Sequence, residues 1–301
     1  ILAADESNGT ADKRLESVGA ETGEEMRKKY RDLFLCVDDL EKYVSGVILY
    51  DETFWQENCS GENFPKALAK KGIVPGIKVD TGANDHPDFP GEKITDGVET
   101  LDERLPKYFD KGARFTKWRA VIRIDEENRL PTDEAIKENA NRLAQYSLKA
   151  QENGLVPIVE PEVLLDGSHS LEKCKEIIIK TLKELFSELS RMEVYLPGLI
   201  LKTSMVISGN KNPDEATIDE VADSTVEALT ESVPENIGGV VFLSGGQTAV
   251  EASSYLDAIA EREPLPWEIA FSYARALQGP AMRIWAGKDE NVADARQEFE
   301  K

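Results

Sequence analysis

Short, almost continuously hydrophobic runs recur along the whole chain, and segments with a helical period separate them. Such runs are typical of parallel strands that are covered on both faces, whereas strands with one face in water alternate. We expect eight strands, within residues 1–5, 43–51, 74–80, 115–125, 155–164, 196–206, 238–245 and 267–275. Their spacing of roughly 30 to 45 residues leaves room for a helix after each strand.

The segments between these runs place hydrophobic residues at the spacing of one helix face. After the first run, Thr22 and Glu25 predict a capping box at a helix N-terminus. The hydrophobic face of that helix is formed by Met26, Tyr30, Leu33, Phe34 and Val37. The helix after the fourth run has the face Ile136, Ala140, Leu143 and Ala144, and the helix after the fifth run has Cys174, Ile178, Leu182, Leu185 and Leu189.

No linker, low-complexity tract or shift of composition divides the chain, so we expect one domain over residues 1–301. Eight strands alternating with helices predict an α/β fold, a closed parallel (β/α)8 barrel of the TIM type. The alternative, an open doubly wound sheet, usually has fewer strands and a glycine-rich phosphate turn after the first, which residues 5–9 do not form. Because the chain starts inside a hydrophobic run, we also expect an N-terminal segment that this sequence omits.

Composition and charge narrow the class of protein. Hydrophobic residues make up 41% of the chain and charged residues 31%, as in globular domains. With 36 Lys and Arg against 57 Asp and Glu, the net charge of −21 disfavours binding to nucleic acid or to an anionic membrane. No hydrophobic run approaches the roughly 18 residues of a membrane helix, and no secretory leader is evident, so we expect a cytoplasmic protein.

Cysteine and histidine are scarce. Cys36, Cys59 and Cys174 are far apart in sequence without a Cys-X-X-Cys motif, which fits a reducing compartment and no structural zinc. The only histidines, His86 and His169, exclude a three-histidine metal site, and a Ser-His-Asp triad would have to use one of them. Because polar and turn residues surround both, we expect solvated loop histidines.

Charged residues gather at the carboxyl ends of the predicted strands, where barrel enzymes carry their working groups. Residues two apart on a strand point to the same side, so four pairs should face the mouth of the barrel. The pairs are Lys78 and Asp80, Lys117 and Arg119, Glu160 and Glu162, and Lys202 and Ser204; Asp5, Tyr50, Asp51, Ser244 and Arg275 end the other strands. One buried charge could be a salt bridge, but charges on four strands predict a polar site.

Lys202 lies in the hydrophobic run Leu-Ile-Leu-Lys-Thr-Ser-Met-Val. It is either an edge lysine whose amine reaches water or an active amine. Burial and the neighbouring Lys117 and Lys78 should lower its pKa toward neutrality and free it to attack a carbonyl as a Schiff-base nucleophile. Glu160, among Ile, Val and Pro, is a candidate general acid and base whose pKa the apolar setting should raise; a salt bridge to a lysine is the alternative.

Two segments predict anion sites. Ser244, Gly245 and Gly246 follow a strand and precede a helical segment, so their backbone N–H groups are free to face an anion, and Arg275 on the next strand could close on it. Ser7, Thr10 and Arg14, after the first strand, form the second candidate; a capped and solvated first helical turn is the alternative.

With these residues identified, the chain resembles the class I fructose-1,6-bisphosphate aldolases, the Schiff-base type, over nearly its whole length. The matching segments are ILAADES (1–7), GIKVD (76–80), KWR (117–119), NGLVPIVEPEVLLDG (153–167), LPGLILK (196–202), FLSGGQ (242–247) and FSYARALQ (271–278). The resemblance implies a TIM-barrel lyase of glycolysis and gluconeogenesis that is cytoplasmic and homotetrameric. It acts on a sugar phosphate through an iminium, without cofactor or metal.

The resemblance also implies a role for each candidate residue. Lys202 would form the Schiff base with the ketone of the dihydroxyacetone phosphate half. Glu160 would transfer protons with support from Lys117, Asp5 would take the C4 hydroxyl proton, and Lys78 and Glu162 would tune the local charge. Ser244, Gly245, Gly246, Ser272 and Arg275 resemble the C1-phosphate site, and Ser7, Thr10, Arg14 and Arg119 are placed to contact the C6-phosphate end.

Thr203-Ser204 stands where many relatives have Pro-Asn after the lysine, Ala274 replaces a glycine, and Thr10 replaces a serine. The sequence ends at Lys301, so we expect the family's C-terminal tail to lie outside it. Two alternatives stay open: a Schiff-base aldolase for another sugar phosphate, such as fructose 1-phosphate or sedoheptulose bisphosphate, and a catalytically silent barrel that serves as a scaffold.

Overall fold

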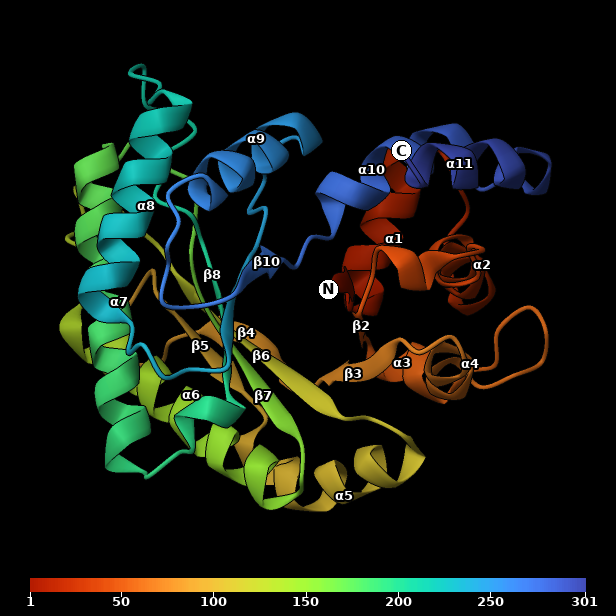
Figure 1. The fold of residues 1–301 in the computed structure, drawn as a ribbon, viewed down its shortest axis with the longest axis horizontal. Coiled ribbons are helices and arrows are strands. Elements are labelled where there is room, and N and C mark those ends of the chain that lie inside the picture. Colours follow the sequence, from red (N-terminus) through yellow and green to blue (C-terminus); the bar gives the residue numbers. More distant parts are fainter.

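The centre of the protein is an eight-stranded parallel barrel, seen in a computed structural model that describes residues 1–301 (Figure 1). In their order around the barrel the strands are β1 (Leu2–Ala4), β2 (Gly46–Leu49), β3 (Val74–Lys78), β6 (Phe115–Ile122), β7 (Val156–Val163), β8 (Ile200–Thr203), β9 (Gly239–Phe242) and β10 (Ile269–Phe271). The first and last strands meet, because Leu2 pairs with Tyr273 in a parallel bridge and Ala3 N donates to Tyr273 O at 3.0 Å. The barrel is therefore closed, which confirms the predicted TIM barrel and excludes the open sheet.

Helices surround the barrel, with α6, α7 and α8 on one side and α1, α2, α10 and α11 on the other (Figure 1). The α-helices are α1 (Asn8–Ser17), α2 (Glu24–Leu35), α3 (Asp51–Trp55), α4 (Phe64–Lys70), α5 (Leu101–Lys111), α6 (Asp133–Glu152), α7 (Leu171–Arg191), α8 (Ile218–Ser232), α9 (Ala249–Ala260), α10 (Arg275–Trp285) and α11 (Val292–Phe299). Short 3₁₀ helices span Leu40–Lys42, Val98–Thr100, Leu196–Gly198 and Asp289–Asn291. An antiparallel hairpin of β4 (Gly82–Asp85) and β5 (Lys93–Asp96), which the sequence pattern did not predict, follows β3.

The lower part of the barrel interior is filled by a small apolar cluster of Ala3, Ile48, Phe115 and Ile158. The Phe115 ring occupies the space beside Gly76, where an added Cβ would lie 2.2 Å from the ring. Glycine is therefore required on β3 by the close approach of an aromatic side chain from β6. This cluster forms the floor on which the polar residues of the next layer lie.

A second and larger core lies between the barrel and its helices. The predicted faces of α6 and α7 are buried there, and so are Tyr30, Leu33 and Phe34 of α2. The predicted capping box of α2 is wrong. The helix begins at Glu24 and its N-cap is Gly23, with a φ of 111°, so Thr22 lies outside the helix. Val37, expected on the same helix, lies beyond its end at Leu35 but is buried.

Both histidines are buried, so their prediction as solvated loop residues is wrong. His86 Nε2 lies 2.9 Å from Glu138 Oε2 of α6, and the His169 ring lies against Gly209 of the loop after β8. Their polar neighbours in sequence indicated solvent, but segments distant in sequence cover them.

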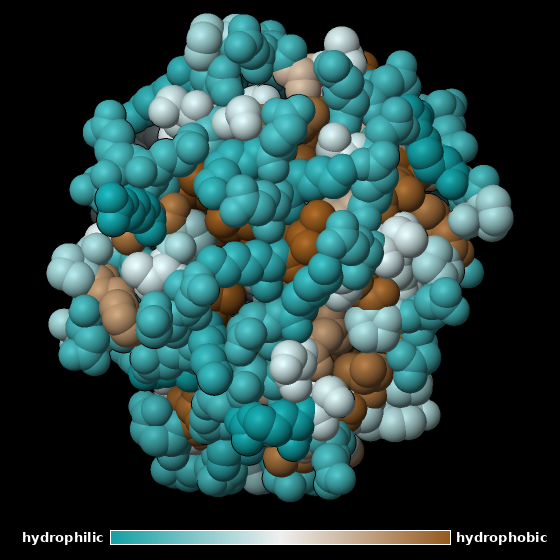
Figure 2. Space-filling view, turned by 90° about the vertical axis from the view of Figure 1, so that its left-hand side faces the viewer, coloured by the Kyte–Doolittle hydropathy of each residue, from teal (hydrophilic) through white to brown (hydrophobic).

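The outer face that carries α7 and α8 is mostly hydrophilic, with hydrophobic residues scattered between polar ones (Figure 2). Ion pairs join the two helices across this face, including Lys183 Nζ to Glu231 Oε1 at 2.6 Å. None of the helices combines the length and the hydrophobicity that crossing a bilayer would require.

Candidate active site

A cavity of about 830 Å³ opens at the carboxyl end of the barrel strands, directly above the apolar floor. Four strands contribute one residue to the floor and, two positions later, a charged residue to the cavity. The pairs are Ala3 and Asp5, Phe115 and Lys117, Ile158 and Glu160, and Ile200 and Lys202. Seven cationic and five anionic side chains line it. In a chain with a net charge of −21, this local excess of positive charge favours an anionic ligand.

Four buried side chains at the bottom of the cavity form one line of alternating charge. Lys202 Nζ lies 2.9 Å from Glu160 Oε1, and the other oxygen of Glu160 lies 2.9 Å from Lys117 Nζ. Lys117 Nζ is also 2.7 Å from Asp5 Oδ2. Each charge faces an opposite one, which compensates the cost of burying it. The lysine of β8 is therefore buried beside a carboxylate and is no edge residue whose amine reaches water.

The charges of this line control its pKa values. Burial alone would raise the pKa of Glu160, but Lys117, Lys202 and Arg119 together lower it below the ordinary value. The prediction that its apolar setting raises the pKa of Glu160 is therefore wrong. For Asp5, too, Lys117 and Lys202 outweigh burial and lower the pKa. Burial would lower the pKa of Lys117, yet Asp5 and Glu160 raise it. The two carboxyls are accordingly ionised and the Lys117 amine is protonated at neutral pH.

Two further ion pairs lie above this line. Lys78 pairs with Asp80, and Arg119 of β6 pairs with Glu162 of β7. Asp80 Oδ2 also accepts the backbone N–H of Arg119 at 3.2 Å, which joins β3 to β6. The predicted inward direction of the residue pairs on β3, β6 and β7 is thus confirmed.

The fourth predicted pair is wrong in one member. Ser204 does not line the cavity: its hydroxyl donates to Val163 O at 2.9 Å and accepts from Val163 N at 3.1 Å. Strand β8 ends at Thr203, so the alternation no longer holds one residue later. Asp51 is likewise absent from the cavity, because it begins α3 and its carboxylate accepts from Tyr108 OH at 2.6 Å; Tyr50 alone lines the cavity from this strand.

One group of residues in the cavity lining has the features of an anion site. Ser244, Gly245, Ser272 and Arg275 line the cavity together, and the buried hydroxyl of Ser272 has no hydrogen-bond partner. Arg275 is the first residue of α10, whose N-terminal N–H groups favour an anion. The backbone N–H groups of Gly245 and Gly246 donate no hydrogen bond within the protein, as expected of the glycine turn, whereas Thr248 and Glu251 close the N-terminus of α9 beyond it with a capping box.

The glycine turn itself approaches Arg275. Gly245 and Gly246 have φ values of 41° and 103°, in the left-handed region that glycine adopts readily. A Cβ added to Gly246 would lie 3.6 Å from Arg275 Nη2, at van der Waals distance, so the turn lies directly beside the guanidinium.

The cavity is also lined by Ser7, Thr10 and Arg14, as predicted, and by Lys13 and Ser17, which the sequence argument missed. Ser7 is the N-cap residue of α1, but its side chain makes no capping hydrogen bond; its Oγ lies 3.1 Å from Thr10 Oγ1. The capping alternative is therefore not observed. Lys13 follows Thr10 by three residues, and that helical spacing was the signal for it.

A buried polar cluster behind β1 was also missed. Glu6 pairs with Arg14 and with Arg31 of α2, and Arg31 Nη2 donates to Glu6 O at 2.8 Å. Gln278 of α10 donates to Ala3 O at 3.1 Å and accepts from Tyr30 OH at 2.7 Å. These contacts fix the backbone on both sides of Asp5, and they join residues too far apart in sequence for any local pattern to indicate.

Comparison with known proteins decides the family. Over residues 1–301 the chain matches the family model described as "Glycolytic: Fructose-bisphosphate aldolase class-I". The chain belongs to the class I fructose-bisphosphate aldolase family. Members of this family are carbon–carbon lyases, so the resemblance inferred from the sequence motifs is confirmed.

Relatives from distant organisms support the assignment to the class I aldolase family. The probable fructose-bisphosphate aldolase class 1 of Xylella fastidiosa is 47% identical over 298 residues, which cover 99% of this chain and 89% of the relative. The fructose-bisphosphate aldolase 4, cytosolic, of Arabidopsis thaliana is 44% identical over 99% of this chain and 76% of its own length. The structure of the Plasmodium falciparum aldolase in complex with TRAP and a small-molecule inhibitor superposes with a TM-score of 0.97 at 44% identity, covering 99% of this chain and 86% of that one.

Proposed function

We propose that this chain catalyses the reversible aldol cleavage of fructose 1,6-bisphosphate to dihydroxyacetone phosphate and glyceraldehyde 3-phosphate, with Lys202 as the Schiff-base lysine. The observation that carries the assignment is the buried contact between Lys202 Nζ and Glu160 Oε1, at 2.9 Å, in a cavity with excess positive charge. An amine beside a carboxylate that can exchange its proton is the arrangement that imine formation requires.

The first step is proton transfer from Lys202 to Glu160. Because Glu160 is ionised in the resting site, one proton that crosses the 2.9 Å between them gives a free amine and a protonated carboxyl together. The amine attacks the C2 carbonyl and forms a carbinolamine. Glu160 then returns its proton to the C2 hydroxyl, which leaves as water, and the nitrogen becomes an iminium.

Cleavage of the C3–C4 bond follows from the charge on the iminium. The electron pair of that bond moves into the iminium and gives a neutral enamine, while Asp5 accepts the proton of the C4 hydroxyl and the aldehyde forms. Asp5 can accept this proton because it is ionised at neutral pH, where Lys117 and Lys202 lower its pKa. Protonation at C3 and addition of water at C2 then release dihydroxyacetone phosphate and return Lys202.

The remaining residues hold the substrate and the charges around it. Lys117 stabilises Asp5 and Glu160, while Lys78 and Glu162 set the field at the rim through their partners Asp80 and Arg119. We assign the C1 phosphate to Ser244, Gly245, Ser272 and Arg275, and the C6 phosphate to Ser7, Thr10, Arg14, Arg119 and Lys13, all of which line the cavity. The predicted Gly246 does not line the cavity and lies beside Arg275 instead.

We further propose a cytoplasmic homotetramer as the working form. The family assignment and the Arabidopsis relative described as cytosolic support this location. Size-exclusion chromatography with light scattering tests the tetramer, and a single-chain mass would contradict it.

Borohydride trapping tests the function. Reduction in the presence of dihydroxyacetone phosphate should add to a peptide that contains Lys202 the mass of one substrate, less the water lost in imine formation and plus the two hydrogens of the reduction. The Lys202→Met variant should lose both adduct and turnover while keeping the fold, whereas Lys211→Met, at an exposed lysine beyond the same strand, should keep both. EDTA should leave turnover unchanged. An unaltered chain mass, or turnover in Lys202→Met, would refute the assignment.

A related sugar phosphate is the second candidate substrate, because the cavity lining includes two groups of candidate phosphate contacts. A substrate with one phosphate would leave the Ser7 group unused. The ratios of kcat/KM among fructose 1,6-bisphosphate, fructose 1-phosphate and sedoheptulose bisphosphate decide between them. We expect the two bisphosphates to be preferred, and no turnover with any of the three would indicate the scaffold alternative.

A further inference from the structure

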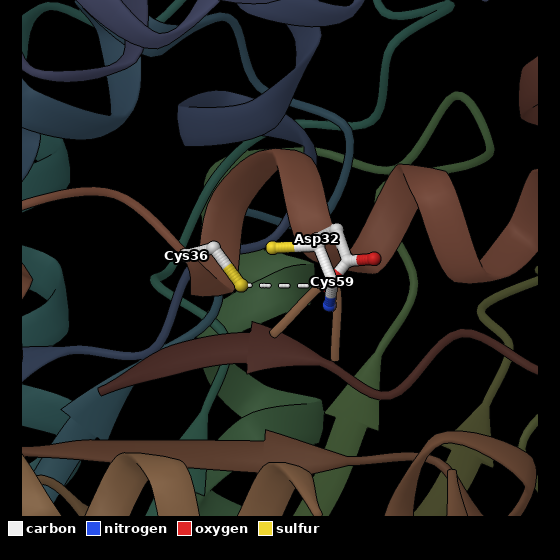
Figure 3. A group of neighbouring side chains, drawn as sticks. All are labelled: Asp32, Cys36 and Cys59. Atoms are coloured by element: carbon white, nitrogen blue, oxygen red, sulfur yellow. Dashed lines mark hydrogen bonds between the residues drawn. The ribbon is translucent and has the colours of Figure 1, made fainter. Parts of the chain in front are cut away.

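Two of the three cysteines meet outside the active site. Cys36 follows the last residue of α2, and Cys59 lies in the loop between α3 and α4. Together with Asp32, one helical turn before Cys36, they place two sulfurs and a carboxylate oxygen within 4.8 Å of one another (Figure 3). The two cysteines are far apart in sequence and form no Cys-X-X-Cys motif, so the sequence did not predict that their thiols lie close together in the folded chain.

The cluster is built from fixed backbone and charge. Asp32 Oδ1 accepts the Cys36 Sγ–H at 3.3 Å and the backbone N–H of Cys59 at 3.0 Å. The side chain of Asn58 orders the loop by accepting the N–H groups of Ser60 at 2.9 Å and Glu62 at 3.1 Å. The other oxygen of Asp32 lies 3.3 Å from Lys28 Nζ, which orients the carboxylate.

The separations fit a small tetrahedral centre. Bonds of about 2.3 Å to sulfur and about 2.1 Å to oxygen at tetrahedral angles give a sulfur–oxygen separation of about 3.6 Å and a sulfur–sulfur separation of about 3.8 Å. The Cys36 sulfur is 3.3 Å from Asp32 Oδ1, and all three pairs lie within 4.8 Å. Only small side-chain shifts separate this arrangement from coordination.

We propose that Asp32, Cys36 and Cys59 form a binding site for a soft divalent cation of the zinc class. Two thiolates and a carboxylate supply three ligands, and water completes the fourth position because Cys59 is exposed. Binding replaces the two thiol protons, which pass to solvent, with one divalent charge. The two charges of the cation balance those of the two thiolates, so the cluster keeps the single negative charge that Asp32 gives it.

A Cys36–Cys59 disulfide is the competing use of the same pair. Its formation would need an oxidant and an attacking thiolate. The geometry favours a cation, because Asp32 Oδ1 lies 3.3 Å from the Cys36 sulfur and also accepts the backbone N–H of Cys59. A carboxylate held beside both cysteines is a third ligand for a cation, and a disulfide would make no use of it.

The site has a structural role at the end of α2. None of its three residues lines the active-site cavity, so the Schiff-base chemistry does not use this cation. Its bond to Cys59 would tie the C-terminus of α2 to the loop before α4. Because α2 also carries Tyr30 and Arg31, which contact the polar cluster behind Asp5, we expect cation binding to stabilise that side of the barrel without changing kcat.

Cobalt(II) is the probe for the test, applied to untagged, chelator-treated protein kept reduced with a phosphine. Wild type should bind one equivalent, with thiolate-to-cobalt charge-transfer bands and the visible bands of tetrahedral cobalt, and zinc should displace the cobalt. Cys36→Ser and Cys59→Ser should each weaken binding at least tenfold and lose intensity in the charge-transfer bands. The control Cys174→Ser, at a buried thiol of α7 outside the cluster, should bind as wild type.

Turnover and circular dichroism of each variant check its fold, and Cys59→Ser at an exposed position gives a folded variant if Cys36→Ser does not. Equal cobalt binding by wild type and Cys59→Ser overturns the proposal. So does a reduced wild type that binds no cobalt. A chain that loses two hydrogens under a glutathione disulfide buffer, and binds no cobalt after reduction, assigns the pair to disulfide formation instead.

Discussion

Replacing Glu160 with glutamine probes the proposed proton transfer most directly. The side chain keeps its length and its place between Lys202 and Lys117, each 2.9 Å from one carboxylate oxygen. It loses the negative charge and can no longer take a proton from Lys202. The amine must then lose its proton to water, and the carbinolamine must lose its hydroxyl without a positioned acid.

The expected magnitude follows from these two losses. A positioned general acid or base contributes about 10²- to 10⁴-fold, which corresponds to about 2.7 to 5.4 kcal/mol at about 1.36 kcal/mol for each factor of ten. Removing one partner of a buried ion pair costs about 3 to 5 kcal/mol of folding stability. The glutamine oxygen still accepts one hydrogen bond and Lys117 keeps Asp5, so we expect the lower end of that stability range.

Steady-state kinetics and trapping separate chemistry from folding. In Glu160→Gln, kcat and the single-turnover rate of borohydride-trappable imine should fall together, by 10²-fold or more, while the trapped residue stays Lys202. The matched control is Glu162→Gln on the same strand, which pairs with Arg119 and not with Lys202; its imine rate should fall less than tenfold. A folded Glu160→Gln variant with kcat within tenfold of wild type would refute the proton-transfer step.

Three other substitutions test the binding, the packing and the charges. Arg275→Ala should raise KM with little effect on kcat, by about ten- to a hundredfold in kcat/KM, because a hydrogen bond to a charged group contributes about 1.5 to 3 kcal/mol; steady-state kinetics check it. Gly76→Ala should lower the free energy of unfolding by about 1 to 3 kcal/mol in a urea titration, because its Cβ would meet Phe115 at 2.2 Å. Burial raises the pKa values of Asp5 and Glu6, but neighbouring cations lower them more, so both lie below their ordinary values. The two ionised carboxylates therefore stabilise the fold at a pH above about 4, the pKa of a carboxyl in the unfolded chain, and this stabilisation is lost as the pH falls below that value. The urea midpoint should drop in that window, and Glu6→Gln should flatten the drop.

The strands and the polar layer could be predicted because both follow from period alone. A parallel strand covered on both faces is hydrophobic throughout, so a charge such as Lys202 in β8 stands out. The residue two positions before it, Ile200, packs against the apolar floor. The same step of two joins Phe115 to Lys117 and Ile158 to Glu160. The local sequence pattern therefore predicted which layer of the barrel carries the charged side chains of the candidate active site.

Most failures occurred where tertiary contacts override local pattern. The exception is local: Gly23, with a φ of 111°, is the N-cap of α2, so Thr22 lies outside the helix. Ser204 lies one residue past the end of β8, where a hydrogen bond to Val163 turns it away from the cavity. The sequence around His86 is polar, but α6 covers the ring. Strand ends and loop burial depend on neighbours that no short window of sequence contains.

The pKa of Glu160 shows how such an override changes the mechanism. Its sequence neighbours are hydrophobic, which predicts a raised pKa and a carboxyl that is already protonated. In the barrel, strands β6 and β8 bring Lys117 and Lys202 to either side of it, and the pKa falls instead. A carboxylate that rests ionised has to take up a proton before it can act as an acid, and we propose that the proton comes from Lys202, whose amine lies 2.9 Å away. Formation of the free amine and of the acid are then one event, and the loss of either partner disables both.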